Sequence, residues 1–141
     1  MKDDLRDLIY SQKQLVQSIK KKLNIEEYIF KLTSFATIIP FYTGTVLNAF
    51  IAYYSNDELK QNAFLTIIVV DKNSRGEGLG KLLLETSIKD LISKGFKNYQ
   101  LEVQISNEKA LELYKKYGFK IVKVSEESYF MNLDLIQYAK R

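Results

Sequence analysis

One segment of the sequence combines residue types that bind anions: Arg-Gly-Glu-Gly-Leu-Gly, from Arg75 to Gly80. It follows an apolar run, Phe64 to Val70, that predicts a buried strand, and it opens a periodic stretch, Lys81 to Lys94, that predicts a helix. Glycines permit positive φ angles and close approach of a ligand, so several N–H groups can converge on one anion. The free N–H groups and dipole of the following helix would add to this attraction. The segment therefore predicts a phosphate-binding loop, with a plain glycine turn as the alternative.

Two well-known phosphate loops do not fit this segment. A Walker-type loop needs four residues between its outer glycines and a hydroxyl residue after its lysine. Here Gly76 and Gly80 enclose three residues, and Leu82 follows Lys81. A dinucleotide fingerprint that starts at Gly78 would need a glycine five residues later, where the sequence has leucine. Both classes of nucleotide site are therefore excluded on residue identity.

A second segment repeats the order of strand, turn and helix. The run from Leu101 to Ile105 alternates apolar and polar residues, which is the period of a half-buried strand. Ser106 or Asn107 can cap the next helix, and Gly118 is a suitable residue to end it. Between them, Ala110 and Tyr114 are four residues apart and share one helix face.

Together, the two segments resemble the signature motifs of the GNAT superfamily of acetyltransferases. Arg-x-x-Gly-x-Gly after a strand resembles the acyl-CoA loop, and Asn, Ala, Leu-Tyr and Gly-Phe in that order resemble the second motif. The resemblance covers Phe64 to Phe119 well, the preceding hairpin loosely and the N-terminal helix hardly at all. It implies acetyl-CoA as the acetyl donor, an amine as the acceptor and no metal.

The resemblance also implies which residues bind the donor. Backbone groups of Ile68 to Val70 would pair with the pantetheine amides, and one N–H would polarise the thioester carbonyl. N–H groups from Gly76 to Lys81 would hold the diphosphate. Asn107 would contact the pantetheine arm, or it is a helix cap, and both can hold. The cofactor-binding residues predicted in this way are Ile68, Val69, Val70, Arg75, Gly76, Glu77, Gly78, Leu79, Gly80, Lys81, Asn107, Ala110 and Tyr114.

Two side chains are candidates for proton transfer. Tyr114 matches the tyrosine that many family members place near the cofactor sulfur, where a neutral phenol can protonate a departing thiolate. Its alternative is a buried core aromatic. Glu102 lies twelve residues earlier, a spacing also found in bacterial acetyltransferases that act on ribosomal-protein N-termini. It is the candidate general base, acting through water, and a solvated carboxylate on the sheet face is its alternative.

Composition restricts the other possibilities. The 141 residues suffice for a single domain, 1–141, and include no cysteine and no histidine. Disulfides and thiolate chemistry are excluded, and the usual metal ligand and neutral-pH base are missing, which argues against a zinc enzyme. The net charge of +4 comes from lysines scattered among acids, apart from Lys20 to Lys22 near an expected helix end. We therefore expect no nucleic-acid or membrane partner and a cytoplasmic location, and a homodimer is an open alternative.

Apolar periodicity predicts an α+β fold. The expected elements are a helix over about 3–23, a helix from Ile25 to about Leu32 with Tyr28 and Phe30 in the core, strands over 35–42 and 45–54, a strand over 64–70, a helix over 77–94, a strand over 98–105, a helix over 107–117, and strands over 119–124 and 129–135. Thr43-Gly44 would turn the first hairpin, and Pro40 predicts an edge strand or a bend. The GNAT resemblance implies an α/β/α layered fold: a mixed, mostly antiparallel sheet, a splayed central strand pair and helices on both faces.

The combined expectation is an N-acetyltransferase that moves an acetyl group from acetyl-CoA to a primary amine. A small molecule or amino sugar is the first acceptor considered, and a protein N-terminus of the ribosomal-protein type is the second. A non-catalytic GNAT module that binds acyl-CoA is a third hypothesis. Acceptor specificity is expected from the N-terminal helices and the last hairpin, because the family places it there.

Overall fold

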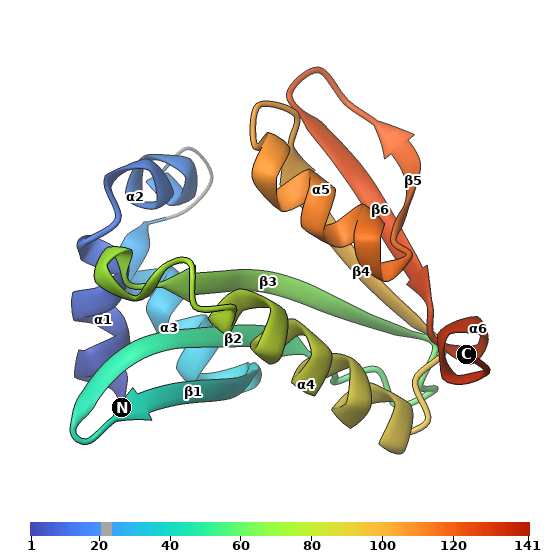
Figure 1. Ribbon diagram of the computed structural model, residues 1–141, viewed down its shortest axis with the longest axis horizontal. Helices are drawn as coiled ribbons and strands as arrows, with labels where there is room; N and C mark the ends of the chain where they lie inside the picture. The colour runs from blue at the N-terminus through green and yellow to red at the C-terminus, as the bar shows by residue number, and fades with distance from the viewer. Residues whose placement is uncertain (21–23) are drawn as a thin grey trace. The chain divides into compact units, whose positions relative to one another are not determined.

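The computed structural model describes residues 1–20 and 24–141 (Figure 1). Its elements are, in order, α1 (Lys2–Tyr10), α2 (Lys13–Lys20), α3 (Ile25–Phe35), β1 (Thr37–Thr43), β2 (Val46–Tyr54), β3 (Asn62–Val70), the 3₁₀ turn η1 (Lys72–Ser74), α4 (Leu79–Ser93), β4 (Asn98–Gln104), α5 (Glu108–Tyr117), β5 (Lys120–Val124), β6 (Ser128–Asp134) and α6 (Leu135–Ala139). The strands form one sheet in the order β1-β2-β3-β4-β6-β5. This arrangement confirms the α+β prediction.

The sheet is mixed, and its parallel pairing lies next to β4. β3 pairs with β4 in parallel over four residue pairs, from Asn62 with Asn98 to Leu65 with Leu101. On its other side, β4 pairs with β6 in antiparallel orientation, and β6 pairs likewise with β5. β1, which contains Pro40, lies at one edge of the sheet as predicted, where a residue without an N–H group is tolerated.

The chain forms two compact units. The first consists of residues 1–52 and 67–84, and the second of residues 53–66 and 85–141. The organisation of the whole chain as a single domain stays a prediction. Within the described part of the chain, no helix is both long and apolar enough to cross a membrane.

The single helix predicted for residues 3–23 is wrong, because two helices lie there. The Ser11 hydroxyl donates to the Leu8 carbonyl (2.6 Å), and the Gln12 N–H donates to the Ile9 carbonyl, three residues earlier (3.0 Å). The first helix therefore ends in a tight turn. Short hydroxyl side chains compete with the helix for backbone groups, which a periodicity argument does not register. The predicted end of this helix, at 21–23, lies outside the described residues.

α3 begins where predicted and shows why one of its aromatic residues was misassigned. Ile25, Ile29 and Leu32 are buried at three- and four-residue spacing, whereas Phe30 is 57% exposed. Each helical residue is rotated by about 100° from the one before, so Phe30 turns away from the face that Ile29 buries. The prediction of a core position for Phe30 is therefore wrong, while Tyr28, at the edge of the buried face, is half-buried.

The N-terminus of α3 provides a test of local stability. Asn24 Oδ1 accepts hydrogen bonds from the N–H groups of Glu26 (2.8 Å) and Glu27 (3.3 Å). We expect Asn24→Ala to lower the free energy of unfolding by about 1 kcal/mol, because both donors then lose their acceptor. Urea denaturation would measure the loss. Asn24→Ser retains a capping oxygen and should stay close to the wild type, and equal losses in both variants would argue against the cap.

In the second unit, β4 alternates as predicted. Tyr99, Leu101 and Val103 are buried, whereas the intervening residues are half-buried. The Tyr99 hydroxyl donates to Ser87 Oγ (2.9 Å), so its polar end is satisfied within the core. This alternation sends the Glu102 side chain to the opposite face of the strand from the aromatic core.

The C-terminal helix α6 was not predicted. Asp134 was expected to continue a strand to Leu135, but its Oδ1 atom accepts hydrogen bonds from the N–H groups of Ile136 and Gln137 (both 3.0 Å). An aspartate in this position is an N-cap, so β6 ends and a short helix begins. The signal was present in the sequence but was too local to outweigh the alternating pattern before it.

Candidate functional site

The glycine segment lies in the first unit, between the end of β3 and the start of α4. Asp71 Oδ2 accepts a hydrogen bond from the Asn73 N–H (3.2 Å) and starts the η1 turn. Gly76 and Gly78 then have φ angles of +86° and +78°, a region that side-chain-bearing residues rarely adopt. The sequence therefore needs glycine at both positions for the backbone to enter α4 along this path.

The three glycines of this turn face open space in the direction in which a side chain would project. A Cβ atom placed on Gly76, Gly78 or Gly80 would have no atom of the described residues within 4 Å. The Leu82 N–H is the first in α4 to bond within the helix, to the Gly78 carbonyl (3.0 Å), so the preceding N–H groups, over 79–81, have no intrahelical acceptor. An open cradle beside exposed helix N–H groups fits a diphosphate, as acetyl-CoA would require.

Arg75 holds the loop from within the first unit. Its Nε donates to the Val70 carbonyl (3.3 Å), and its guanidinium also donates to the Gln12 side-chain oxygen. Arginine has five N–H donors, so these bonds leave others for a ligand. Its predicted contact with a diphosphate stays a prediction. Gln12, which lies between α1 and α2, was missed because nothing in its sequence context points to this loop.

Asn48 also holds the glycine loop in place, although it was not predicted from the sequence. Asn48 in β2 donates from Nδ2 to Ser74 Oγ (3.1 Å), and its carbonyl accepts from the Asp71 N–H (2.7 Å). Its Oδ1 atom is buried without a hydrogen-bond partner among the described residues. The sequence did contain a signal for this role, because Asn48 is a single amide side chain within the apolar run of β2, and buried polar groups usually have a hydrogen-bond partner.

In the second unit, Glu102 lies on β4 directly opposite Phe130 of β6. The carboxylate is half-buried and shares its strand face with Gln100 and Gln104. Directly opposite residues of an antiparallel pair lie close enough for their side chains to interact. Glu102 therefore lies on a partly covered polar face, and its assignment as a base stays a prediction.

Asn107 is the N-cap of α5. Its Oδ1 accepts a hydrogen bond from the Ala110 N–H (3.2 Å), and its carbonyl accepts from the Leu111 N–H (3.0 Å). The capping role is thereby confirmed. The predicted contacts of Asn107 and Ala110 with the pantetheine arm stay predictions.

Tyr114 is half-buried on α5 and rests on an aromatic cluster. Its ring lies 5.6 Å from that of Phe119 at an interplanar angle of 59°, and Phe119 lies 5.7 Å from Tyr99, both measured between centroids. The Phe119 N–H also donates to the Tyr114 carbonyl (3.1 Å), through the turn at Gly118, whose φ is +103°. The ring is therefore held by both its backbone and its neighbours.

The electrostatic setting of Tyr114 keeps its side chain in the neutral form. Burial raises the pKa of its hydroxyl to about 12, because the phenolate is poorly solvated there. No hydrogen bond joins this hydroxyl to another residue in the part of the chain that the structure describes. At neutral pH, Tyr114 is thus a neutral phenol with a donor available for a ligand.

The predicted residues divide between the two units. The first unit brings together the end of β3, the glycine loop and the start of α4, whereas the second holds Glu102, Asn107, Ala110 and Tyr114. Over residues 1–20 and 24–141, no group of three or more acidic side chains is arranged to hold a metal ion.

Comparison with known proteins identifies the class. Residues 3–119 match the acetyltransferase (GNAT) family, and the chain therefore belongs to it. This confirms the resemblance seen in the two motifs and places the chain in a family of acyltransferases that use acetyl-CoA.

Three individual proteins illustrate the relationship. The chain is 26% identical over 129 residues to N-alpha-acetyltransferase 30 of Dictyostelium discoideum, covering 87% of this chain and 70% of that protein. It is 42% identical over 57 residues to [Ribosomal protein bS18]-alanine N-acetyltransferase of Escherichia coli K12, covering 40% of this chain and 38% of that protein. It spans half or less of the length of several other curated relatives. The PaiA N-acetyltransferase of Thermoplasma acidophilum, solved with coenzyme A, shares the fold with a TM-score of 0.75 at 19% identity, covering 94% and 92% of the two chains.

Proposed function

We propose that this protein is an acetyl-CoA-dependent N-acetyltransferase whose acceptor is the α-amino group of a peptide or protein N-terminus. The observation that carries the proposal is the open glycine turn at the start of α4, in a chain that belongs to the GNAT family. Gly76 and Gly78 hold backbone angles that create the turn, and the first N–H groups of α4 are available to the diphosphate.

The remaining roles are those that the family resemblance implies for these residues. Acetyl-CoA supplies an acetyl thioester, and backbone groups of Ile68 to Val70 would align its pantetheine arm. Glu102 would take a proton from the acceptor amine through water, and Tyr114 would give its proton to the departing sulfur. A C–N bond then forms as the C–S bond breaks, which leaves Glu102 protonated and Tyr114 as a phenolate, and proton exchange with solvent restores both.

The choice of acceptor rests on the sequence relatives. The two relatives described above are named for N-alpha-acetylation and for acetylation of the bS18 alanine. The twelve-residue interval between Glu102 and Tyr114 supports the same choice through its resemblance to the ribosomal-protein enzymes. A small-molecule amine or amino sugar, the first acceptor considered from the sequence, is the second candidate.

Calorimetric titration with acetyl-CoA followed by a thiol-release assay tests this function. We expect a dissociation constant in the micromolar range, because the KM values of enzymes usually lie between about 1 μM and 1 mM. Thiol release should require peptides with a free α-amine and should be absent with the same peptides blocked at the N-terminus. Release with amino sugars alone would favour the second candidate. Binding without release by any amine would favour a non-catalytic module, and absence of binding would overturn the proposal.

The cytoplasmic location, the absence of a nucleic-acid partner and the open question of a homodimer stay sequence-based predictions. Nitrocellulose retention of labelled nucleic acid at physiological salt tests the second of these, and we expect no retention. Light scattering of the purified chain tests the third.

A further inference from the structure

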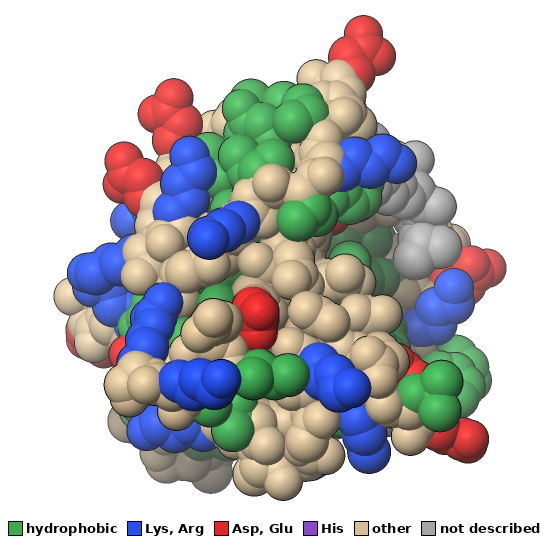
Figure 2. All heavy atoms as spheres, turned by 90° about the vertical axis from the view of Figure 1, so that its right-hand side faces the viewer, with side chains coloured by type: hydrophobic (Ala, Val, Ile, Leu, Met, Phe, Trp, Pro, Cys, Tyr) green, Lys and Arg blue, Asp and Glu red, His purple; other side chains and the backbone are tan. Residues whose placement is uncertain are grey.

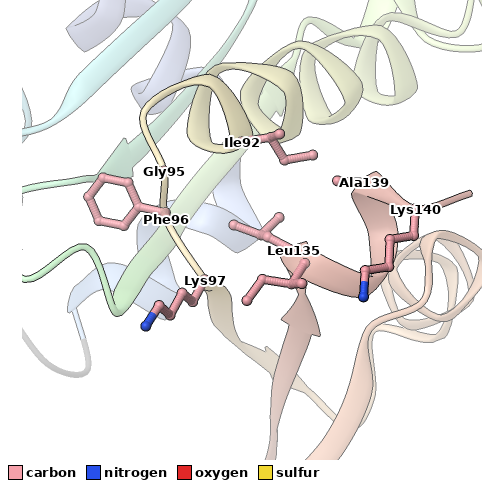
Figure 3. A pocket seen from close by; sticks show the side chains of 8 residues that line it. Ile92, Gly95, Phe96, Lys97, Leu135, Ala139 and Lys140 are labelled. Atoms are coloured by element: carbon pink, nitrogen blue, oxygen red, sulfur yellow. The ribbon is translucent and has the colours of Figure 1, made fainter.

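The second unit contains a pocket that none of the proposed acetyl-transfer residues lines. Its volume is about 380 Å³, within the usual range for small-molecule sites. It lies among the end of α4, the turn that precedes β4, and α6 (Figure 3). The residues that line it are Ile92, Gly95, Phe96, Lys97, Leu135, Ile136, Ala139 and Lys140.

The pocket is held together by backbone hydrogen bonds between segments distant in sequence. The Lys97 N–H donates to the Lys60 carbonyl (3.0 Å), and the Leu135 N–H donates to the Lys97 carbonyl (2.9 Å). Gly95, with a φ of +86°, lets the chain reverse at the end of α4 so that Phe96 packs inward. Leu135 is 1% exposed and gives the pocket an apolar floor, whereas the ring of Phe96, which is 3% exposed, turns away from Ile92 and Leu135 into the interior (Figure 3).

Positive charge surrounds this apolar floor. Lys97 and Lys140 belong to the lining, and the Lys60 ammonium lies 5.0 Å from the centroid of the Phe96 ring. None of these three lysines forms an ion pair with a residue that the structure describes. Figure 2, which looks onto the side where α6 lies in Figure 1, shows basic and hydrophobic side chains on this face, together with acidic ones.

Asp57 interacts electrostatically with Lys60, whereas no acidic side chain of the described residues forms an ion pair with Lys97 or Lys140. Asp134 accepts two N–H groups as the cap of α6, and Asp90 is paired with Lys94 (2.8 Å) and with the Tyr53 hydroxyl (2.5 Å). No acidic residue contributes to the lining. A ligand with an apolar body and one negative group would therefore complement both parts of the pocket.

We propose that this pocket binds a small amphiphilic carboxylate. Its hydrocarbon part packs against Ile92, Leu135 and Ala139, and its carboxylate interacts with the ammonium group of Lys140, while Lys97, which points in another direction in Figure 3, adds to the positive potential of the site. The pocket adjoins the start of β4, whereas Glu102 lies five residues beyond Lys97, roughly 17 Å along an extended strand. The site is thus separate from Glu102, and the proposal does not depend on the acetyl-transfer function.

NMR titration of the full chain with octanoate tests the proposal. We expect saturable shifts of the backbone amide signals of Gly95, Phe96, Leu135 and Ala139, with a dissociation constant in the millimolar range, as suits a ligand of few atoms. Octylammonium keeps the tail and reverses the charge, and acetate keeps the charge without the tail. Neither should produce these shifts. Equal binding of octylammonium, or shifts spread evenly over the protein, would overturn the proposal.

Three variants test the charged part and the apolar part of the pocket separately, with one control. Lys97→Gln combined with Lys140→Gln should weaken octanoate binding about fivefold, because two partly exposed charge interactions are lost. Ala139→Phe should abolish the saturable shifts by filling the pocket from an exposed helix position. Lys89→Gln removes an exposed lysine of α4 that does not line the pocket and should leave binding unchanged. If Lys89→Gln weakened binding as much as the double variant, or Ala139→Phe bound normally, the assignment would be wrong.

Discussion

Tyr114→Phe is expected to lower the turnover number by about 10²- to 10⁴-fold while leaving the affinity for acetyl-CoA nearly unchanged. The substitution removes only the hydroxyl, so the ring keeps its contact with Phe119 and the helix keeps its packing. Steady-state kinetics with a saturating acceptor and calorimetry with acetyl-CoA would measure the two quantities separately.

The pH dependence of the wild type sharpens this test. Because burial raises the pKa of Tyr114 to about 12, its acid form is fully present at neutral pH and is lost only as the pH approaches that value. Turnover should therefore show no loss attributable to Tyr114 between pH 7 and about pH 10. A loss over that interval that disappears in Tyr114→Phe would contradict the assigned protonation state.

Tyr117→Phe is the matched control, because it removes a tyrosine hydroxyl from the same helix. Tyr117 donates to the Glu85 carboxylate and has no role in the proposed chemistry. Its turnover should stay close to that of the wild type. If both variants lost activity equally, the effect would reflect the stability of α5, and if Tyr114→Phe kept full turnover, Tyr114 would not be the acid.

Gly80→Val is expected to raise the dissociation constant for acetyl-CoA by about 5- to 150-fold with little change in the unfolding temperature. Gly80 lies in the first turn of α4 outside the positive-φ region, and a Cβ there would meet no described atom within 4 Å. The isopropyl group would instead occupy space beside the helix N–H groups. A clash with a ligand of about 1–3 kcal/mol corresponds to roughly 5- to 150-fold in affinity.

The choice of Gly80 separates ligand effects from strain. A bulky residue at Gly78 would also weaken binding, but its φ of +78° would strain any side-chain-bearing residue whether or not a ligand is present. Gly80→Ala adds one methyl group and should have a smaller effect than Gly80→Val. Calorimetry and thermal unfolding of both variants would decide. An unchanged affinity in a folded Gly80→Val protein would show that the diphosphate binds elsewhere.

Much of the fold and part of the candidate site could be predicted from the sequence. Gly76 and Gly78 both require φ angles that glycine adopts without strain, and the alternation along β4 follows from the two-residue period of a strand. Asn107 capping α5 is equally local, because the acceptor and donor are three residues apart. These features depend on backbone geometry and near neighbours, which the sequence displays directly.

Other features were decided only by tertiary structure. The hydrogen bonds between Arg75 and Gln12 and between Asn48 and Ser74 join segments that are far apart in the chain. The exposure of Phe30 likewise depends on which distant residues pack against α3. The lysine-rimmed pocket likewise requires α6 to pack near the end of α4. Local propensity determines where helices, strands and glycine turns can form, whereas the burial of each face depends on which distant residues pack against it, and that selection is made by the folded chain as a whole.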